Sequence, residues 1–130
     1  MPYKIKRIDD GSTIMVNYYE LLNSYEMYAA CSELFSGAEQ IMNYEVIISD
    51  FTDVSQTHLR DLDVKRLAKV CDKAAAHKQD IIAVFIMPTA FLYSLGRIWQ
   101  EHALTLPWKV RVVRTRKEAT DWIESLLKFS

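Results

Sequence analysis

The chain has 130 residues and a formal net charge of −1, with half of its residues hydrophobic and a quarter charged. This length suits one domain with its own core, so we expect residues 1–130 to form a single domain. Only three glycines and three prolines are present, which argues against a disordered or loop-rich chain. The near-neutral charge provides no global field to attract nucleic acid or an anionic membrane.

The hydrophobic residues and cysteines indicate where the protein works. The N-terminal residues alternate polar and apolar side chains and do not resemble a secretory signal. The longest apolar run, Ile81–Pro88, is far shorter than the ~20 residues that span a bilayer. Cys31 and Cys71 each fall within a helical pattern and are expected to be buried free thiols. We therefore expect a cytoplasmic protein that does not insert into a membrane.

The first third of the sequence predicts a hairpin followed by a helix. Residues 3–8 alternate with period two and predict a strand. Asp9–Ser12 contains Asp-Gly, a hairpin turn signal, so residues 13–18 are expected to form the returning strand. Asn23, with Glu26 three residues later, predicts the start of a helix that ends near residue 35.

The rest of the chain alternates between strand and helix patterns. Short apolar runs predict strands covered on both faces, and apolar residues three and four apart predict amphipathic helices. The expected strands cover residues 44–51, 80–86 and 109–114, and the expected helices cover 57–77, 88–104 and the stretch from 115 onward.

These elements predict an α/β fold with the order ββαβαβαβα. We expect a mixed five-stranded sheet with four helices. Right-handed crossovers between parallel strands would place the sheet between helical layers. The order of the strands within the sheet is left open by the pattern.

Three segments from Tyr44 onward resemble a known group of domains. A buried strand reaches Asp50 and continues as Phe51–Val54, and a later helix contains Leu95–Ile98. A basic strand followed by an Ala-x-x-Trp helix spans Val110–Ile123. Together these segments resemble the STAS-like group called SpoIIAA-like, which shares its fold with anti-sigma-factor antagonists.

The resemblance implies a regulatory or ligand-binding role and frequent self-association, without a known reaction. Antagonists of this fold carry an Ile-Asp-Ser-Ser-Gly-type segment whose serine is a phosphorylation switch. Here the corresponding stretch, Val54–Leu59, has no Ser-Ser-Gly. We therefore do not expect this chain to switch partners by phosphorylation of a serine at that position.

One candidate site lies at the carboxyl ends of the parallel strands, where open α/β sheets bind ligands. Helix N-termini at this edge would hold an anion, and a phosphate on Ser55 or Thr57 would use the same geometry. The alternative is that Thr57, Thr89 and Thr115 cap helices while Asp50 ends a strand. The candidate anion or phosphorylation edge comprises Asp50, Thr52, Asp53, Ser55, Thr57 and Thr89.

A second candidate site is the segment from Ala90 to Leu106, which carries apolar residues on nearly two helical faces. A second apolar face is covered by another element, a ligand or another chain. Gly96 costs ~1 kcal/mol relative to Ala inside a helix and is tolerated where something packs closely. The loop at Leu106–Trp108 or the N-terminal hairpin is an internal alternative. The candidate interface or ligand-binding residues are Phe91, Leu92, Leu95, Gly96, Arg97, Trp99 and Ala103.

No catalytic, metal or cofactor site is predicted. His58 lies near Asp53 and Ser55 in sequence, but a nucleophile elbow is missing. His58, His77 and His102 are widely spaced and belong to no metal-binding motif. A glycine-rich phosphate loop is also missing. We therefore expect a protein without enzymatic activity, metal or cofactor.

Basic residues gather around the last strand. Aromatic residues do not interleave with them as on a base-stacking platform. We interpret the group as a solvated strand edge and helix start rather than a nucleic-acid site. Its members are Lys109, Arg111, Arg114, Arg116 and Lys117.

The sequence thus predicts a regulatory or protein-interaction module, expected to be a homodimer because a self-complementary apolar patch favours a two-fold pair. The alternative is a small-molecule carrier or sensor for an apolar or anionic ligand.

Overall fold

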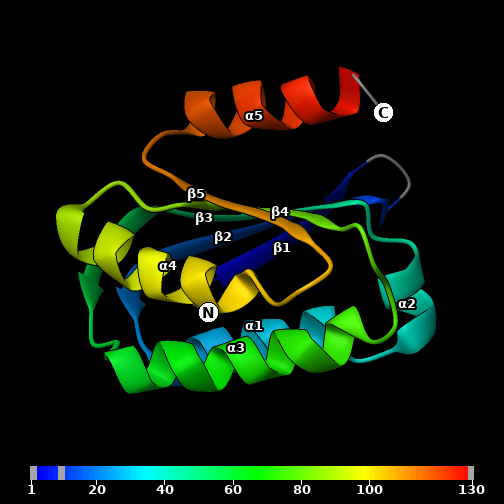
Figure 1. Ribbon diagram of the computed structural model, residues 1–130. Coiled ribbons are helices and arrows are strands. Elements are labelled where there is room, and N and C mark those ends of the chain that lie inside the picture. Colours follow the sequence, from blue (N-terminus) through cyan, green and yellow to red (C-terminus); the bar gives the residue numbers. More distant parts are fainter. Residues whose placement is uncertain (1–2, 9–10, 129–130) are drawn as a thin grey trace.

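The computed structural model describes residues 3–8 and 11–128 and confirms the predicted α/β fold (Figure 1). Asp9 and Asp10 of the predicted turn lie outside the described residues. The strands are β1 (Tyr3–Ile8), β2 (Thr13–Leu22), β3 (Val46–Thr57), β4 (Ile82–Ile86) and β5 (Lys109–Val113). The helices are α1 (Ser24–Leu34), α2 (Ala38–Met42), α3 (Asp61–Ala75), α4 (Ala90–Ala103) and α5 (Arg116–Lys128).

The sheet is mixed and five-stranded, and its strand order β1-β2-β3-β4-β5 follows the chain. β1 is antiparallel to β2, and every later pair is parallel. Each crossover therefore moves in the same direction across the sheet. With the usual right-handed connection this places the crossover helices on one face. Figure 1 shows α1, α3 and α4 beneath the sheet and α5 alone on the other face.

Side-chain caps fix the starts of three helices, as the sequence predicts. The Asn23 side chain accepts a hydrogen bond from the backbone N–H three residues later, at 3.0 Å. The Thr89 and Thr115 hydroxyls do the same, at 3.2 and 3.1 Å. Each bond satisfies a donor that the first helical turn leaves free.

The connection from β3 to α3 differs from the prediction. β3 continues to Thr57 and pairs with the end of β2, where the predicted helix was expected to begin at about residue 57. α3 begins at Asp61 instead, and the Asp63 carboxylate accepts from the Arg60 N–H at 3.0 Å. Thr57 is therefore not the cap of α3. Its hydroxyl accepts from the Leu59 N–H at 3.4 Å.

The short helix α2 was not predicted. It has five residues and follows Gly37. Such a short helix carries too little apolar periodicity to be recognised. Its single buried residue, Ile41, joins the core beneath the sheet.

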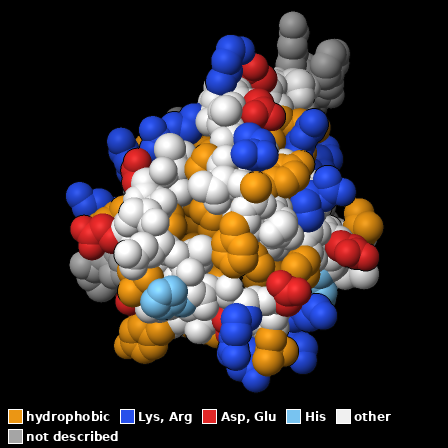
Figure 2. All heavy atoms as spheres, turned by 90° about the vertical axis from the view of Figure 1, so that its left-hand side faces the viewer, with side chains coloured by type: hydrophobic (Ala, Val, Ile, Leu, Met, Phe, Trp, Pro, Cys, Tyr) orange, Lys and Arg blue, Asp and Glu red, His pale blue; other side chains and the backbone are white. Residues whose placement is uncertain are grey.

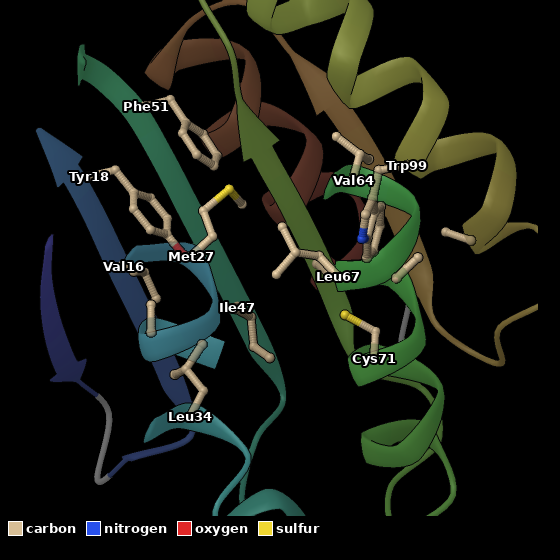
Figure 3. Close-up of a cluster of buried hydrophobic side chains, with 14 of the residues drawn as sticks. Val16, Tyr18, Met27, Leu34, Ile47, Phe51, Val64, Leu67, Cys71 and Trp99 are labelled. Carbon is tan, nitrogen blue, oxygen red and sulfur yellow. The ribbon is translucent and has the colours of Figure 1, made fainter. Parts of the chain in front are cut away.

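The main core lies between the sheet and α1, α3 and α4. Figure 3 shows side chains from β2, β3 and these helices pointing into the space between the layers. The rings of Tyr18 and Phe51 stack with centroids 4.6 Å apart, and those of Phe85 and Trp99 lie 4.5 Å apart. Aromatic pairs at these distances add to the burial of apolar area.

Gly96 allows α4 to pack closely on the sheet. A Cβ atom built at this position would clash with the Met87 sulfur and lie 2.8 Å from a Val112 methyl group. The expectation that something packs tightly against Gly96 is confirmed. The close neighbour is the chain's own sheet.

Candidate functional site

A polar network lies at the carboxyl end of the sheet. Asp50 is the last residue of β3 that pairs with β4, and its side chain is only 3% exposed. One carboxylate oxygen accepts from the N–H and hydroxyl of Thr52. The other accepts from Arg116 Nε at 2.7 Å. Asp50 therefore ties β3, at the point where its pairing with β4 stops, to the first residue of α5.

The same guanidinium reaches a second carboxylate. Arg116 Nη2 lies 3.4 Å from Asp53 Oδ2, which also accepts from Asn17 Nδ2 at 3.2 Å. The hydrogen bond and the charge of Asp50 raise the pKa of Arg116. Two carboxylates and one guanidinium leave a formal charge of −1, which does not favour an anion. The structure thus brings Asp50, Thr52 and Asp53 together in a different kind of site from the predicted anion edge.

The other residues of the predicted edge form hydrogen bonds outside this network. Ser55 lies on the end of β3, with its hydroxyl 3.4 Å from the Glu20 carbonyl. Thr89 caps α4. Neither Ser55 nor Thr57 lies at the N-terminus of α3, so the predicted placement of a phosphate at a helix start is wrong for both.

The end of β3 forms a two-stranded extension with β2. β4 ends opposite Asp50, whereas Asp53–Thr57 continue to pair with Tyr19–Leu22. Two register shifts interrupt this pairing, and Glu20 adopts a positive φ of 62°. The irregular strand holds the exposed side chains of Thr52, Asp53 and Ser55 at the edge of the sheet.

The predicted interface on α4 needs correction. Five of its seven residues are buried within the chain and are not available to a partner: Leu92, Leu95, Gly96, Trp99 and Ala103. Trp108 covers them in part, because it is buried in the same core and donates from Nε1 to the Lys78 carbonyl at 2.8 Å. The internal alternative at Leu106–Trp108 is therefore supported. Only Phe91 and Arg97 of the set are exposed.

Three exposed apolar side chains lie at matching positions around the carboxyl edge. Tyr25, Leu62 and Phe91 are each the second residue of a helix that starts there. They are 76%, 49% and 51% exposed. Figure 2 views this end of the molecule and shows hydrophobic side chains in its middle, with charged side chains around them. We call these residues, with Thr52, Asp53 and Ser55, the carboxyl-edge surface.

Sequence reasoning missed Tyr25 and Leu62 as surface residues. The helical period places Leu62 on the apolar side of its helix with Leu59 and Leu67, which are buried. The same period places Asp63 on the polar side, but Asp63 is buried because it caps the helix start. Leu62 and Asp63 both lie in the first turn of the helix, where capping rather than the helical period decides which side chain is buried. Their position in the sequence was the signal that could have predicted this.

An internal cavity of ≈ 60 Å³ lies between the sheet and the three helices beneath it. Its lining is largely apolar and includes Leu92, Leu95 and Trp99 of the predicted ligand-binding set. The cavity is smaller than the roughly 150 Å³ that holds benzene in an engineered apolar cavity. In this conformation it has no room for a larger ligand.

Both cysteines line this cavity as free thiols, as predicted, with Cys71 buried and Cys31 partly buried. Burial raises the pKa of the Cys31 thiol to about 12 and raises the pKa of Cys71 well above its ordinary value. Burial likewise raises the pKa of the neighbouring Tyr18 phenol. The thiols stay protonated at neutral pH and behave as apolar groups rather than nucleophiles.

Residues 3–8 and 11–128 contain no group of three or more His, Cys, Asp or Glu side chains placed to hold a metal ion. Across the same residues, no helix has the length and apolar character needed to cross a membrane.

The fold resembles that of solved structures at low sequence identity. The anti-sigma factor antagonist SpoIIAA in its unphosphorylated form matches with a TM-score of 0.57 and 14% identity, over 94% of this chain and 97% of that chain. The Bacillus cell fate determinant SpoIIAA in the phosphorylated form matches with a TM-score of 0.55 and 15% identity, over 93% and 98%.

A third match is an uncharacterized protein from the DUF3478 family, with a SpoIIAA-like fold, from Shewanella loihica PV-4. Its TM-score is 0.52 and its identity 15%, over 92% of this chain and 90% of that chain. No family model and no curated protein matches the sequence. The chain thus has the SpoIIAA-like fold that its sequence predicts.

Proposed function

We propose that the protein is a regulatory module that binds a protein partner through the carboxyl-edge surface. The observation that carries this proposal is the placement of Tyr25, Leu62 and Phe91, exposed at the start of three helices around one edge. Exposed apolar side chains grouped on a soluble domain mark an interaction site. Aromatic residues among them are frequent anchors of binding energy.

The polar part of the surface supports the same proposal. The Asp50–Arg116 pair holds the end of β3 against the start of α5, so Thr52 and Asp53 are presented on a fixed backbone. A preorganised surface loses less conformational entropy when a partner binds. SpoIIAA, the anti-sigma factor antagonist with the same fold, is named for action on another protein.

Non-enzymatic action and a cytoplasmic location are parts of this proposal. The polar groups of the carboxyl edge are engaged with one another, and the buried thiols stay protonated. The two free cysteines fit a reducing compartment.

Substitutions at the two ends of α4 test the partner surface. Phe91→Asp places a charge in the carboxyl-edge surface, and Leu104→Asp places the same charge at the far end of the helix, where Leu104 is 82% exposed. Affinity capture from the source cells should retain a protein on the wild type and on Leu104→Asp but not on Phe91→Asp. Equal retention by all three, or by none, would reject the carboxyl-edge surface as the binding site.

Homodimerisation is a separate proposal, and the buried stripe of α4 is not available for it. The exposed apolar residues of the carboxyl edge are the surface we propose for self-association. Native mass spectrometry should then show a dimer for the wild type and for Leu104→Asp, and a monomer for Phe91→Asp. A monomeric wild type would reject the dimer and leave a different protein as the partner.

The internal cavity favours a carrier for a small apolar ligand as the second candidate. It is lined by Met27 and Met87 among other apolar side chains, and flexible methionines adapt readily to ligands. Because the cavity is only ≈ 60 Å³, the helices would have to separate before a larger molecule enters. Native mass spectrometry of freshly purified protein should then show the mass of a retained ligand. If the protein carries no added mass, decanoate can be added as an apolar probe ligand. A bare protein whose melting temperature decanoate does not raise would reject the carrier.

A further inference from the structure

β5 forms an open edge of the sheet. Among the described strands it pairs only with β4. The Lys109 N–H donates to the Ile81 carbonyl at 2.9 Å, and the Val113 carbonyl accepts from the Met87 N–H at 2.8 Å. Backbone groups of successive residues in a strand point to opposite sides. The N–H and C=O groups of Val110 and Val112 therefore point away from β4, toward the open edge.

A groove of ≈ 490 Å³ runs along this edge. Its floor is formed by residues 110–113 of β5 and by Arg114, which follows the strand. Tyr93 and Arg97 of α4 form one wall, and Glu118 and Trp122 of α5 form the other. The groove is thus walled by helices from both faces of the sheet, and its base is a strand with free backbone groups.

The charges around the groove are mostly positive. Arg97, Arg111 and Arg114 line it together with a single acidic residue, Glu118. No carboxylate of the described residues forms a salt bridge with any of the three arginines. Arg114 instead donates two hydrogen bonds to the Pro88 carbonyl, at 3.0 and 2.7 Å, and lies over the Tyr93 ring.

We propose that this groove binds an acidic, extended segment of a partner protein, which adds to β5 as a sixth strand of the sheet. The free backbone groups of Val110 and Val112 would supply the hydrogen bonds of this strand addition. Acidic side chains of the added strand would meet Arg97 on the side of α4 and Arg111 on the side of α5. The charge of the groove selects an acidic occupant.

The same charge disfavours a second copy of this chain as the occupant. A two-fold pairing of β5 with β5 would bring the two identical patches together. Each patch contributes three arginines and one glutamate. The repulsion between them is absent when the occupant is acidic.

The test uses the labelled peptide acetyl-Thr-Glu-Val-Glu-Glu-Val-Glu-Thr-amide, which is acidic on both faces when extended, in a fluorescence anisotropy titration. The test variant is Arg97→Glu with Arg111→Glu. The matched control is Lys4→Glu with Lys6→Glu, which makes the same change of charge on β1, the opposite edge strand. All four side chains are exposed, so both variants should fold, and circular dichroism checks this.

We expect saturable binding that weakens by at least about tenfold in the groove variant and stays near the wild-type value in the control. Amide exchange should slow at Val110 and Val112 when the peptide is added, because their N–H groups enter a new ladder. Equal weakening in both variants would mean attraction by charge alone and would overturn the proposal. The proposal would also be overturned if peptide binding did not saturate, or if the amide exchange rates of Val110 and Val112 did not change when the peptide is added.

Discussion

The two faces of the sheet are covered to very different depths. Beneath the sheet, α1, α3 and α4 bury one large core that includes the stacked rings of Tyr18, Phe51, Phe85 and Trp99. On the other face, α5 alone buries a small cluster, with Val84, Ile86, Val113 and Ala119 as its buried members. Figure 1 shows this asymmetry directly.

The difference follows from the topology. Because strand order equals chain order, all the crossovers lie beneath the sheet, and only the helix after the last strand can cover the opposite face. Stability should therefore depend mainly on the layer beneath the sheet. Contacts with a partner at the upper face or at the sheet edges should therefore disturb the stability of the fold least.

The largest effect is expected from tryptophans on opposite faces. Trp99 is 7% exposed in the main core, whereas Trp122 of α5 is only half-buried. Trp99→Ala should lower the free energy of unfolding by about 3–5 kcal/mol, the range for a large core aromatic. Trp122→Ala should cost about 1–2 kcal/mol, because less of its area leaves water on folding. Urea unfolding measures both, and an equal loss would contradict the comparison.

A smaller effect is expected at the contact between α4 and the sheet. Gly96→Ala gains about 1 kcal/mol of helix propensity but inserts a methyl group against Met87 and Val112. Overpacking of this kind costs about 1–3 kcal/mol, so we expect a net loss of stability.

Two further variants separate the close contact from other effects of Gly96→Ala. Ser94→Ala, at an exposed position of the same helix, should stay within about 0.5 kcal/mol of the wild type. In a double-mutant cycle, Gly96→Ala should cost less when Val112→Ala has made room for the new methyl group. An unchanged cost would mean that Val112 is not the limiting contact.

The sequence predicted the strands and the class of fold because apolar runs and helix caps are local signals. Asn23, Thr89 and Thr115 cap helices as expected, since capping requires only a side chain and the N–H three residues on. The apolar stripes of α4 were recognised, but what covers them was not. Trp108 and α3 fill that role, and their positions depend on the whole chain.

The candidate site was predicted only in part, for the same reason. The position of Asp50 at a strand end placed it at the carboxyl edge. Its pairing with Arg116, 66 residues later in the chain, depends on how α5 docks on the sheet. The extension of β3 was unpredictable locally, because Asp53–Thr57 are polar and their strand character depends on pairing with the end of β2.

A dependence of stability on pH should also arise from the layer beneath the sheet, where the two thiols lie. Burial raises the pKa of Cys31 to about 12 and that of Cys71 well above its ordinary value. An unfolded cysteine loses its proton near pH 8.5. Above that pH the unfolded chain releases protons that the folded chain keeps, so unfolding becomes more favourable. The stabilisation is complete below about pH 8.5 and is lost as the pH rises toward the folded pKa.

The free energy of unfolding should therefore fall by up to about 1.4 kcal/mol per pH unit for each buried thiol. Urea titrations at neutral pH and at about pH 10 measure this fall. The control is the double variant Cys31→Ala/Cys71→Ala, in which the fall with pH should be shallower while the burial of Tyr18 still contributes some of it. The slopes are compared rather than the absolute stabilities, because removing two sulfur atoms enlarges the cavity. If the slope of the double variant equalled that of the wild type, the alkaline loss of stability would come from groups outside the cavity.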